Sequence, residues 1–212
     1  MKAVLFLLLS SLLALAADPP LYDLREGDIL FQGNKGPQSD AIRAATDSPY
    51  THCGIVVEKN GQLAVFEAAQ PVKVTPLTDF VSRSVPGTYK AMRLAQPIHP
   101  AWLAKAKDWA EDLIGEPYDF KFEWSDDAYY CSELVWKTYL AGGIELCKPK
   151  RFSDYDLEDP VVAALIEQRY GGIENLPLDE AAVAPGDLAA SAMLAEVPML
   201  PASQSTTPTN EP

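Results

Sequence analysis

The sequence predicts one α+β domain in which an antiparallel sheet or small barrel packs against helices. Short apolar or alternating segments, which are typical of strands, dominate the first half of the chain, and two of them flank an Asn-Gly turn. Segments with helical periodicity follow in the second half. The chain has 212 residues, of which 48% are hydrophobic, so it is long enough to bury a core without cross-links.

The N-terminal residues have the pattern of a secretory signal peptide. Met1-Lys2 gives a positive start, residues 3–13 are mostly apolar, and small residues precede a cleavage position near Ala16 or Ala17. The apolar run is shorter than the about 20 residues that a membrane-spanning helix needs. We therefore expect residues 1–17 to be removed and the remaining protein to be exported, as a periplasmic or secreted protein.

Strand and helix patterns follow in a regular order along the mature chain. Alternation and apolar runs predict strands at residues 28–32, 53–57, 63–68, 72–75 and 89–94. Helices are expected at residues 39–45 with Ser39 as the cap, at 77–83, at 100–114 and from about Cys131 onward.

The C-terminal part of the chain carries weaker signals. Periodicity fades after Tyr170, and the composition becomes rich in Pro, Ser and Thr toward the end. We expect the folded domain to cover residues 18–196 and a disordered tail to cover residues 197–212.

An Asn-Gly pair fixes how the second and third strands face each other. Asn60-Gly61 favours a type I′ turn, because both central positions of that turn need positive φ. A two-residue loop at this point places Val56 opposite Val65. Since side chains alternate between the faces of a strand, Cys53 then points away from the face that carries His52.

The same register brings a histidine close to a carboxylate. Gly54 lies opposite Glu67, and His52 becomes the diagonal neighbour of Glu67 at about 7–8 Å between backbones, which long side chains can cross. A carboxylate beside an imidazole fixes its tautomer and stabilises its protonated form. The alternative is structural, with Glu67 in water at a strand end and His52 capping a sheet edge.

Cys131 opens a helix on its buried stripe. Apolar or large residues recur at Leu134, Val135, Thr138 and Tyr139, which share a helix face with Cys131. A thiol at a helix N-terminus has a lowered pKa, and free backbone N–H groups there can hold an oxyanion. A buried structural cysteine fits the pattern equally well. The upstream pair Asp126-Asp127 could cap or precede the helix.

The remaining cysteines and the second histidine are expected to play no part in catalysis. Cys53 points away from His52, and sequence leaves open whether it pairs with Cys147. His99 precedes a helix and is expected to be a surface turn residue. No metal site is expected, because the His, Cys and Glu residues lack the usual spacing of ligand pairs.

Five segments, in this order, resemble the permuted papain-like amidases, the YiiX/YaeF-like group of the NlpC superfamily: REGDILFQ, THCGIVV, VFEA, GEPYDFKFEW and YYCSELVW. They span most of the chain before the tail. The histidine strand, the glutamate strand and the YCSELV helix form the specific part of the resemblance. Departures are Cys53, where such proteins often carry an apolar residue, and the long acidic, Pro-rich C-terminus.

The resemblance implies a circularly permuted papain-like (NlpC-type) fold with the histidine before the cysteine. It implies Cys131 as nucleophile, His52 as general base and Glu67 as the residue that orients the histidine, with Tyr118 near the site as a substrate or oxyanion contact. The thiolate would attack an amide or ester carbonyl and form a thioacyl intermediate that water resolves. This chemistry requires no metal and no organic cofactor.

Three functions remain open from the sequence. The first is a cysteine amidase or peptidase that cleaves a peptide or an acyl amide of the cell envelope. The second is a lipid esterase or acyltransferase that uses the same thiol and needs an apolar acyl channel. The third is a binding module without catalysis. The formal net charge of −13 argues against nucleic acid as a partner, and the oligomeric state is not encoded in these patterns.

Overall fold

The computed structural model describes residues 21–200, so the expected signal peptide and residues 201–212 of the expected tail lie outside the described part. A six-stranded sheet with antiparallel neighbours has the order β4-β3-β2-β1-β5-β8. Its strands are β1 (Ile29–Gln32), β2 (His52–Lys59), β3 (Gln62–Ala68), β4 (Val72–Pro76), β5 (Lys90–Leu94) and β8 (Leu194–Glu196). The predicted α+β class with an antiparallel sheet packed against helices is confirmed.

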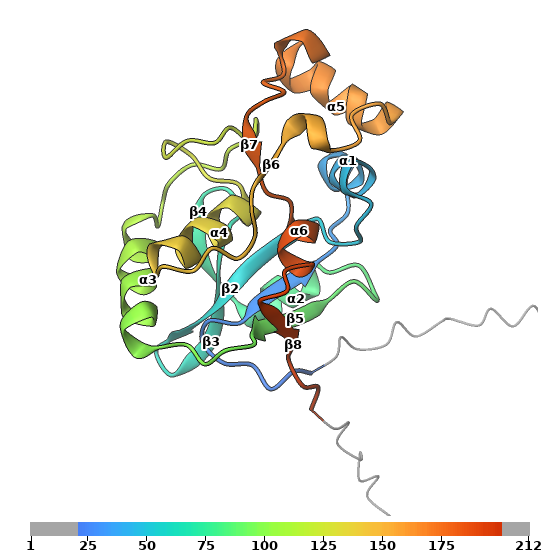
Figure 1. Ribbon diagram of the computed structural model, residues 1–212. Coiled ribbons are helices and arrows are strands. Elements are labelled where there is room, and N and C mark those ends of the chain that lie inside the picture. Colours follow the sequence, from blue (N-terminus) through green and yellow to red (C-terminus); the bar gives the residue numbers. More distant parts are fainter. Residues whose placement is uncertain (1–20, 201–212) are drawn as a thin grey trace, which may run out of the picture.

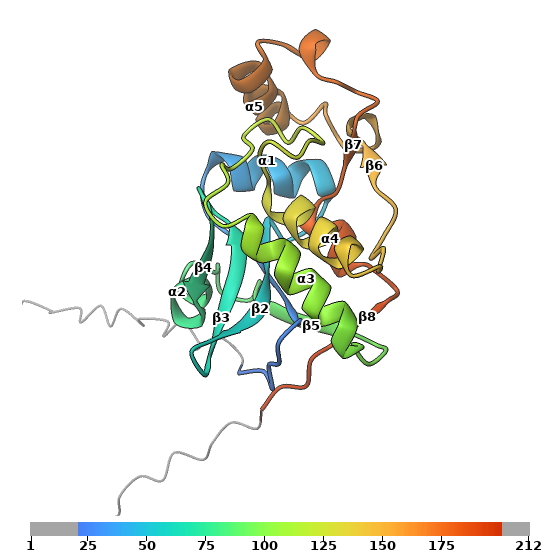
Figure 2. The same ribbon diagram turned by 90° about the vertical axis from the view of Figure 1, so that its left-hand side faces the viewer.

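Helices cover both faces of this sheet (Figures 1 and 2). On one face, α3 (Pro100–Asp112) and α4 (Cys131–Ala141) pack against Ile29, Phe31 and Cys53. On the other face, the short α2 (Leu77–Ser82) places Phe80 against Leu30, Val56 and Val65. Alternating residues of the same strands thus enter two separate cores, as the period of two along a strand requires.

A second, smaller group of elements lies beyond one end of the sheet, at the top of Figure 1. It contains α1 (Pro37–Thr46), β6 (Lys150–Arg151), η1 (Phe152–Asp154), α5 (Pro160–Tyr170), η2 (Ile173–Asn175) and β7 (Ala181–Ala182), and α6 (Pro185–Ala189) leads back to the sheet. Apolar side chains of α1, η1, α5 and β7, together with the residue after η2, form one cluster: Ala41, Phe152, Val162, Ile166, Leu176 and Ala182. The sequence did not predict α5, because its short continuous apolar run lacks a polar face.

Two boundaries differ from those expected. The first helix begins at Pro37 with Gly36 as its N-cap, so Ser39 lies buried inside the helix and is not a cap. Proline suits this position, because its fixed φ matches a helix and its missing N–H would have no partner there. At the other end, the chain contacts the body beyond residue 196: Val197 is buried, and Met199 forms a β-bridge with Tyr22.

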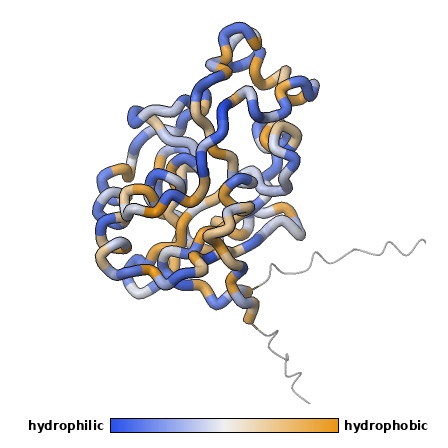
Figure 3. Tube along the Cα trace, in the orientation of Figure 1, coloured by the Kyte–Doolittle hydropathy of each residue, from blue (hydrophilic) through white to orange (hydrophobic). Residues whose placement is uncertain are grey.

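Figure 3 shows hydrophobic segments along the central strands and the helices that cover them. Within residues 21–200, no helix combines the length and the hydropathy that crossing a bilayer requires.

Candidate active site

The β2–β3 hairpin has the predicted turn and register. Asn60 and Gly61 have φ angles of 54° and 75°, as a type I′ turn requires. Val56 lies opposite Val65. The prediction made from the Asn-Gly pair is therefore confirmed, and the ladder continues toward His52 on one strand and Glu67 on the other.

Gly54 allows the two strands to bring these side chains together. A Cβ at position 54 would lie 2.5 Å from Val65 Cγ1 and 2.9 Å from the Phe66 carbonyl oxygen, closer than van der Waals contact. Without that obstruction, His52 Nε2 lies 2.5 Å from Glu67 Oε2. The structure thus joins the imidazole and the carboxylate that the register placed diagonally.

Glu67 is fully buried and has three partners. Besides His52, Thr75 Oγ1 donates to Glu67 Oε1 at 2.5 Å, and Arg83 Nη2 lies 2.6 and 2.8 Å from the two carboxylate oxygens. Burial alone would raise the pKa of Glu67, but His52, Thr75 and Arg83 together lower it to about 2. Glu67 is therefore an anion under ordinary conditions.

Sequence reasoning missed both of these additional partners of Glu67. The alternation along residues 72–75 carried a usable signal for Thr75, because an antiparallel pairing puts it on the face of Glu67. Arg83 follows α2, and no local pattern indicates that its guanidinium turns back to the sheet.

His52 uses Nε2 for Glu67, which leaves Nδ1 as the nitrogen available to Cys131. Burial alone would lower the pKa of His52, but the charge of Cys131, a hydrogen bond with its sulfur and the contact with Glu67 raise it to about 9. The pKa of Cys131 is held well below its usual range. A hydrogen bond from Cys53 lowers the pKa of Cys131 most. The charge of His52 lowers it further, and together these two effects outweigh burial, which raises it. The two shifts favour a thiolate–imidazolium pair.

Cys131 is the first residue of α4, and the predicted buried stripe is confirmed: Cys131, Leu134, Val135, Thr138 and Tyr139 are all buried. Of the two roles expected for Asp126-Asp127, capping is wrong, and the pair precedes the helix. The N-cap is Tyr130, whose backbone N–H donates to Glu133 Oε2 at 3.3 Å, so the helix closes its own first turn. Asp126 instead pairs with Lys137 Nζ at 2.7 Å.

Val183, which directly follows β7, holds the start of α4 in place from the other side. The backbone N–H of Val183 donates to the Tyr130 hydroxyl at 3.2 Å, and Ser132 Oγ donates to the Val183 carbonyl at 2.6 Å. Amides in the first turn of a helix have no intrahelical acceptor. The Cys131 backbone N–H therefore lies at the sulfur as a candidate oxyanion donor.

Cys53 lies close enough to Cys131 to affect its pKa, although Cys53 points away from His52 along β2. It is fully buried and belongs to the same apolar cluster as Cys131, because α4 packs on the Cys53 face of the sheet. Burial raises the pKa of the Cys53 thiol, and the hydrogen bond to Cys131 raises it further, so Cys53 stays protonated and donates. All three cysteines are free, including Cys147, which is not paired with Cys53.

Replacing Cys53 with alanine is expected to raise the pKa of Cys131, because it removes the hydrogen bond that most lowers that pKa. The pH dependence of alkylation of Cys131 by iodoacetamide, followed by mass spectrometry, measures this shift. Cys147→Ala is the matched control. Neither His52 nor Cys131 affects the pKa of this half-buried thiol, so its removal should not move the alkylation profile of Cys131. An unchanged profile in Cys53→Ala would show that Cys53 is only a packing residue.

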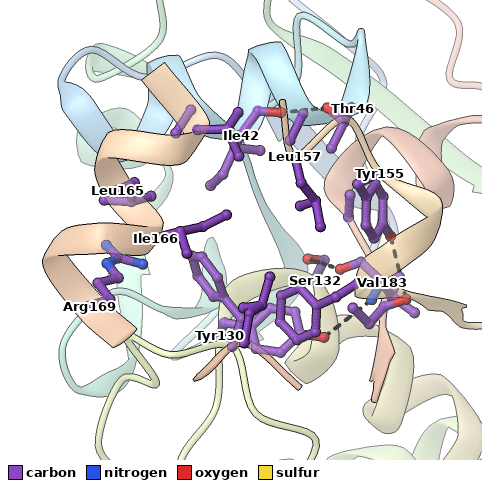
Figure 4. A pocket seen from close by; sticks show the side chains of 18 of the residues that line it. Ile42, Thr46, Tyr130, Ser132, Tyr155, Leu157, Leu165, Ile166, Arg169 and Val183 are labelled. Carbon is purple, nitrogen blue, oxygen red and sulfur yellow. Dashed lines mark hydrogen bonds between the residues drawn. The ribbon is translucent and has the colours of Figure 1, made fainter. Parts of the chain in front are cut away.

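A pocket of about 110 Å³ opens beside Cys131, between the start of α4 and the group formed by α1, α5 and the β7 segment (Figure 4). A cavity of only ~10–15 Å³ is enough to hold one water molecule, so the volume of this pocket is several times what a single water needs. Its walls are mainly aliphatic and aromatic, and include Ile42, Phe122, Tyr130, Leu165, Ile166 and Val183. These side chains come from segments that are distant in sequence.

Tyr118 lines this pocket, as its expected contact with substrate requires. Burial raises the pKa of its hydroxyl, and the negative charge of Cys131 raises it further, so the hydroxyl lies within electrostatic range of the thiolate. Gln38 Nε2 donates to the Tyr118 oxygen at 2.8 Å. His99, in contrast, is the N-cap of α3, where its Nδ1 accepts from the Ala101 N–H at 3.2 Å.

A thiol at a helix N-terminus, next to a histidine strand of an antiparallel sheet, defines a papain-like arrangement in which the histidine precedes the cysteine in the chain. The chain belongs to the family described as permuted papain-like amidase enzyme, YaeF/YiiX, C92 family, which matches residues 23–198. The predicted family and its permuted papain-like fold are thereby confirmed. Membership places the chain among enzymes of the cysteine amidase or peptidase-like hydrolase type.

Two relatives illustrate the match. The chain is 41% identical over 160 residues to the uncharacterized protein YiiX of Escherichia coli (strain K12). The aligned region covers 75% of this chain and 78% of YiiX. A crystal structure of YiiX from Escherichia coli O157:H7, described as a metalloprotein and as DUF1105, superimposes with a TM-score of 0.77 at 38% identity. That match covers 83% of this chain and 97% of the other. Within residues 21–200, no three His, Cys, Asp or Glu side chains group as a metal site.

Proposed function

We propose that this protein is an exported cysteine hydrolase that cleaves an acyl amide. Cys131 is the nucleophile, His52 is the general base and acid, and Glu67 orients His52. The thiolate attacks the carbonyl carbon while the Cys131 N–H binds the oxyanion. The imidazolium then gives its proton to the leaving amine, and water attacks the thioacyl intermediate to release the carboxylic acid and regenerate the thiolate.

The apolar pocket beside Cys131 is the observation that carries the choice of substrate. A peptide of the cell envelope would expose polar backbone groups to walls formed largely by aliphatic and aromatic side chains, where unpaired polar groups are costly. A fatty acyl chain matches those walls and gains about 0.8 kcal/mol for each buried CH₂. Tyr118 and Cys131 both line this pocket, so Tyr118 would contact the acyl group near the scissile bond.

The same pocket supports a second candidate, a lipid esterase or acyltransferase that uses the same thiol. The two candidates share the thioacyl step and differ in the leaving group and in what accepts the acyl group. We favour the amidase because His52, with its raised pKa, is protonated when the leaving amine needs a proton. The third reading, a binding module, does not account for the buried contacts that join Glu67, His52 and Cys131.

The cellular setting follows from the sequence alone. The predicted signal peptide at residues 1–17 supports export to the periplasm or beyond, and envelope lipids or acylated amines there would be the substrates. The acidic chain remains a poor partner for nucleic acid.

The test is a series of 4-nitroanilides with acyl chains of two to fourteen carbons, measured with the full chain and with Leu165→Trp. We expect kcat/KM to rise about 3- to 4-fold for each added CH₂ until the pocket is full. Leu165→Trp adds bulk to the α5 wall of the pocket, so it should lower turnover of long chains much more than turnover of the acetyl substrate. Matched 4-nitrophenyl esters and added amine acceptors separate the esterase and acyltransferase readings. Activity that is independent of chain length would contradict an acyl-binding pocket.

A further inference from the structure

Arg169 differs from every other arginine of the chain. All six arginines lie within the described residues, and five of them pair with a carboxylate: Arg25, Arg43, Arg83, Arg93 and Arg151. Within residues 21–200, Arg169 has no carboxylate within salt-bridge distance. In a chain with a net charge of −13, acidic partners are plentiful, so an unpaired guanidinium is notable.

The unpaired arginine lines the pocket beside Cys131. It projects from α5 on the same side of the pocket as Leu165 and Ile166 in Figure 4. Its Nη1 is buried without a hydrogen-bond partner, whereas its Nη2 donates to Gln38 Oε1 at 2.6 Å. Burying a charged group without a counter-charge is costly, and burial lowers the pKa of Arg169 accordingly.

Several contacts hold the guanidinium in one place. It lies over the rings of Phe122 and Phe120, with Cζ 4.9 and 5.8 Å from their centroids. Gln38, its hydrogen-bond acceptor, donates in turn to Tyr118. Arg169 is therefore only two hydrogen bonds away from Tyr118, which itself lies within range of the thiolate charge.

The neighbouring titratable groups do not neutralise Arg169. Asp119 affects its pKa, but Asp119 Oδ1 accepts from the Lys121 N–H at 2.7 Å and forms no ion pair with the guanidinium. Tyr118 and Tyr170 also face it, and burial raises the pKa of both hydroxyls, so neither is an anion near neutral pH. The pocket thus contains a fixed positive charge with an unused donor.

We propose that Arg169, positioned by Gln38, binds an anionic oxygen group of the substrate, a carboxylate or a phosphate, close to the bond that Cys131 attacks. This inference rests on the proposed function and deepens it, because it makes the substrate an acyl compound with an acidic head. An N-acyl amino acid has this form: its chain would fill the apolar walls, and its carboxylate lies a few bonds from the amide carbonyl. Arg169 is then a specificity-determining residue, since charge-assisted hydrogen bonds to an oxyanion need its planar donors.

Binding to the full chain carrying Cys131→Ala tests this inference without requiring turnover. Calorimetry compares N-dodecanoylglycine with N-dodecanoylglycinamide, which differ only in the carboxylate. Dodecanoyl lysophosphatidate and monododecanoylglycerol form the corresponding phosphate arm. We expect the acid of at least one arm to bind about 10- to 100-fold more tightly than its neutral partner. Arg169→Met should remove this preference, and Arg169→Lys should restore part of it.

The control is Arg151→Met, which removes an exposed arginine paired with Asp154 and should keep the full preference. Equal affinity for acid and neutral ligands in the protein that retains Arg169 would overturn the inference while leaving the acyl pocket intact; this comparison needs no arginine variant to fold. A preference that persists in Arg169→Met would also overturn it. Failure of every dodecanoyl ligand to bind would contradict the proposed function itself, and the inference with it.

Discussion

Replacing Cys131 with alanine is expected to lower kcat/KM for a long-chain acyl 4-nitroanilide by about 10⁴-fold to 10⁶-fold. The thioacyl intermediate cannot form without the sulfur, and the remaining oxyanion donor and pocket can supply only a small part of the rate. Alanine is smaller than cysteine and is an excellent helix former, so α4 and its buried stripe should persist. Initial rates and the mass of the trapped acyl-enzyme, at a fixed pH near neutrality, measure the loss.

Cys147→Ala is the control for this experiment. Its thiol is half-buried away from His52, and burial raises its pKa to about 11, so it is neither activated nor near a base. We expect this variant to hydrolyse substrate and to form the acyl adduct as the wild type does. Hydrolysis that survives in Cys131→Ala, or an acyl group found on another residue, would end the case for Cys131 as nucleophile.

The parts of the site that sequence predicted are those that local chemistry determines. Asn60-Gly61 fixes a two-residue turn, and the turn fixes the register that sets Glu67 beside His52. Likewise, helical periodicity starting at Cys131 places the thiol on a buried stripe. In both cases the relevant residues are close in sequence, so one element or one hairpin contains the whole constraint.

The parts that sequence missed depend on how distant elements pack. Cys53 was correctly assigned to the face away from His52, yet it shares an apolar cluster with Cys131 and affects its pKa, because α4 docks on that face. No sequence pattern within β2 or α4 indicates which face of the sheet α4 will cover. Arg83 and Arg169 reach the site from elements whose own sequences carry no sign of that destination.

The pocket is the clearest case of long-range information. Its walls combine residues 41–46, 118–132 and 152–185, and the largest contribution comes from α5 and the segment around β7, which had no predicted structure. Sequence could state only that an acyl-processing enzyme would need such a space. The choice between a peptide and an acyl chain therefore became possible only when the walls of the pocket were known.

Glu67→Gln is expected to lower kcat/KM by about 10³-fold to 10⁴-fold and to move its alkaline limb to lower pH. In the wild type, kcat/KM should fall at low pH as Cys131 gains a proton, and again above about pH 9 as His52 loses the proton that the leaving amine needs. Glu67 contributes to the raised pKa of His52 through its charge and its hydrogen bond. A neutral side chain at position 67 removes that charge, so the imidazolium deprotonates at lower pH.

Arg83 strengthens this effect. Its guanidinium lies 2.6 and 2.8 Å from the two oxygens of Glu67, and in Glu67→Gln it becomes an uncompensated positive charge near His52. Like charges disfavour protonation of the imidazole, so this too lowers its pKa. Full pH profiles of kcat/KM, and NMR titration of the His52 ring, should both report the change.

Thr75→Val is the matched control, because it removes a hydrogen bond to Glu67 Oε1 and leaves the carboxylate charge in place. Since the pKa of Glu67 lies near 2, the carboxylate stays ionised in this variant throughout the active range, and the alkaline limb should remain near pH 9. The two variants thus separate charge from hydrogen bonding at one carboxylate. If the limb of Glu67→Gln stayed at pH 9, Cys131 alone would hold the proton on His52, and Glu67 would act only by orienting the ring.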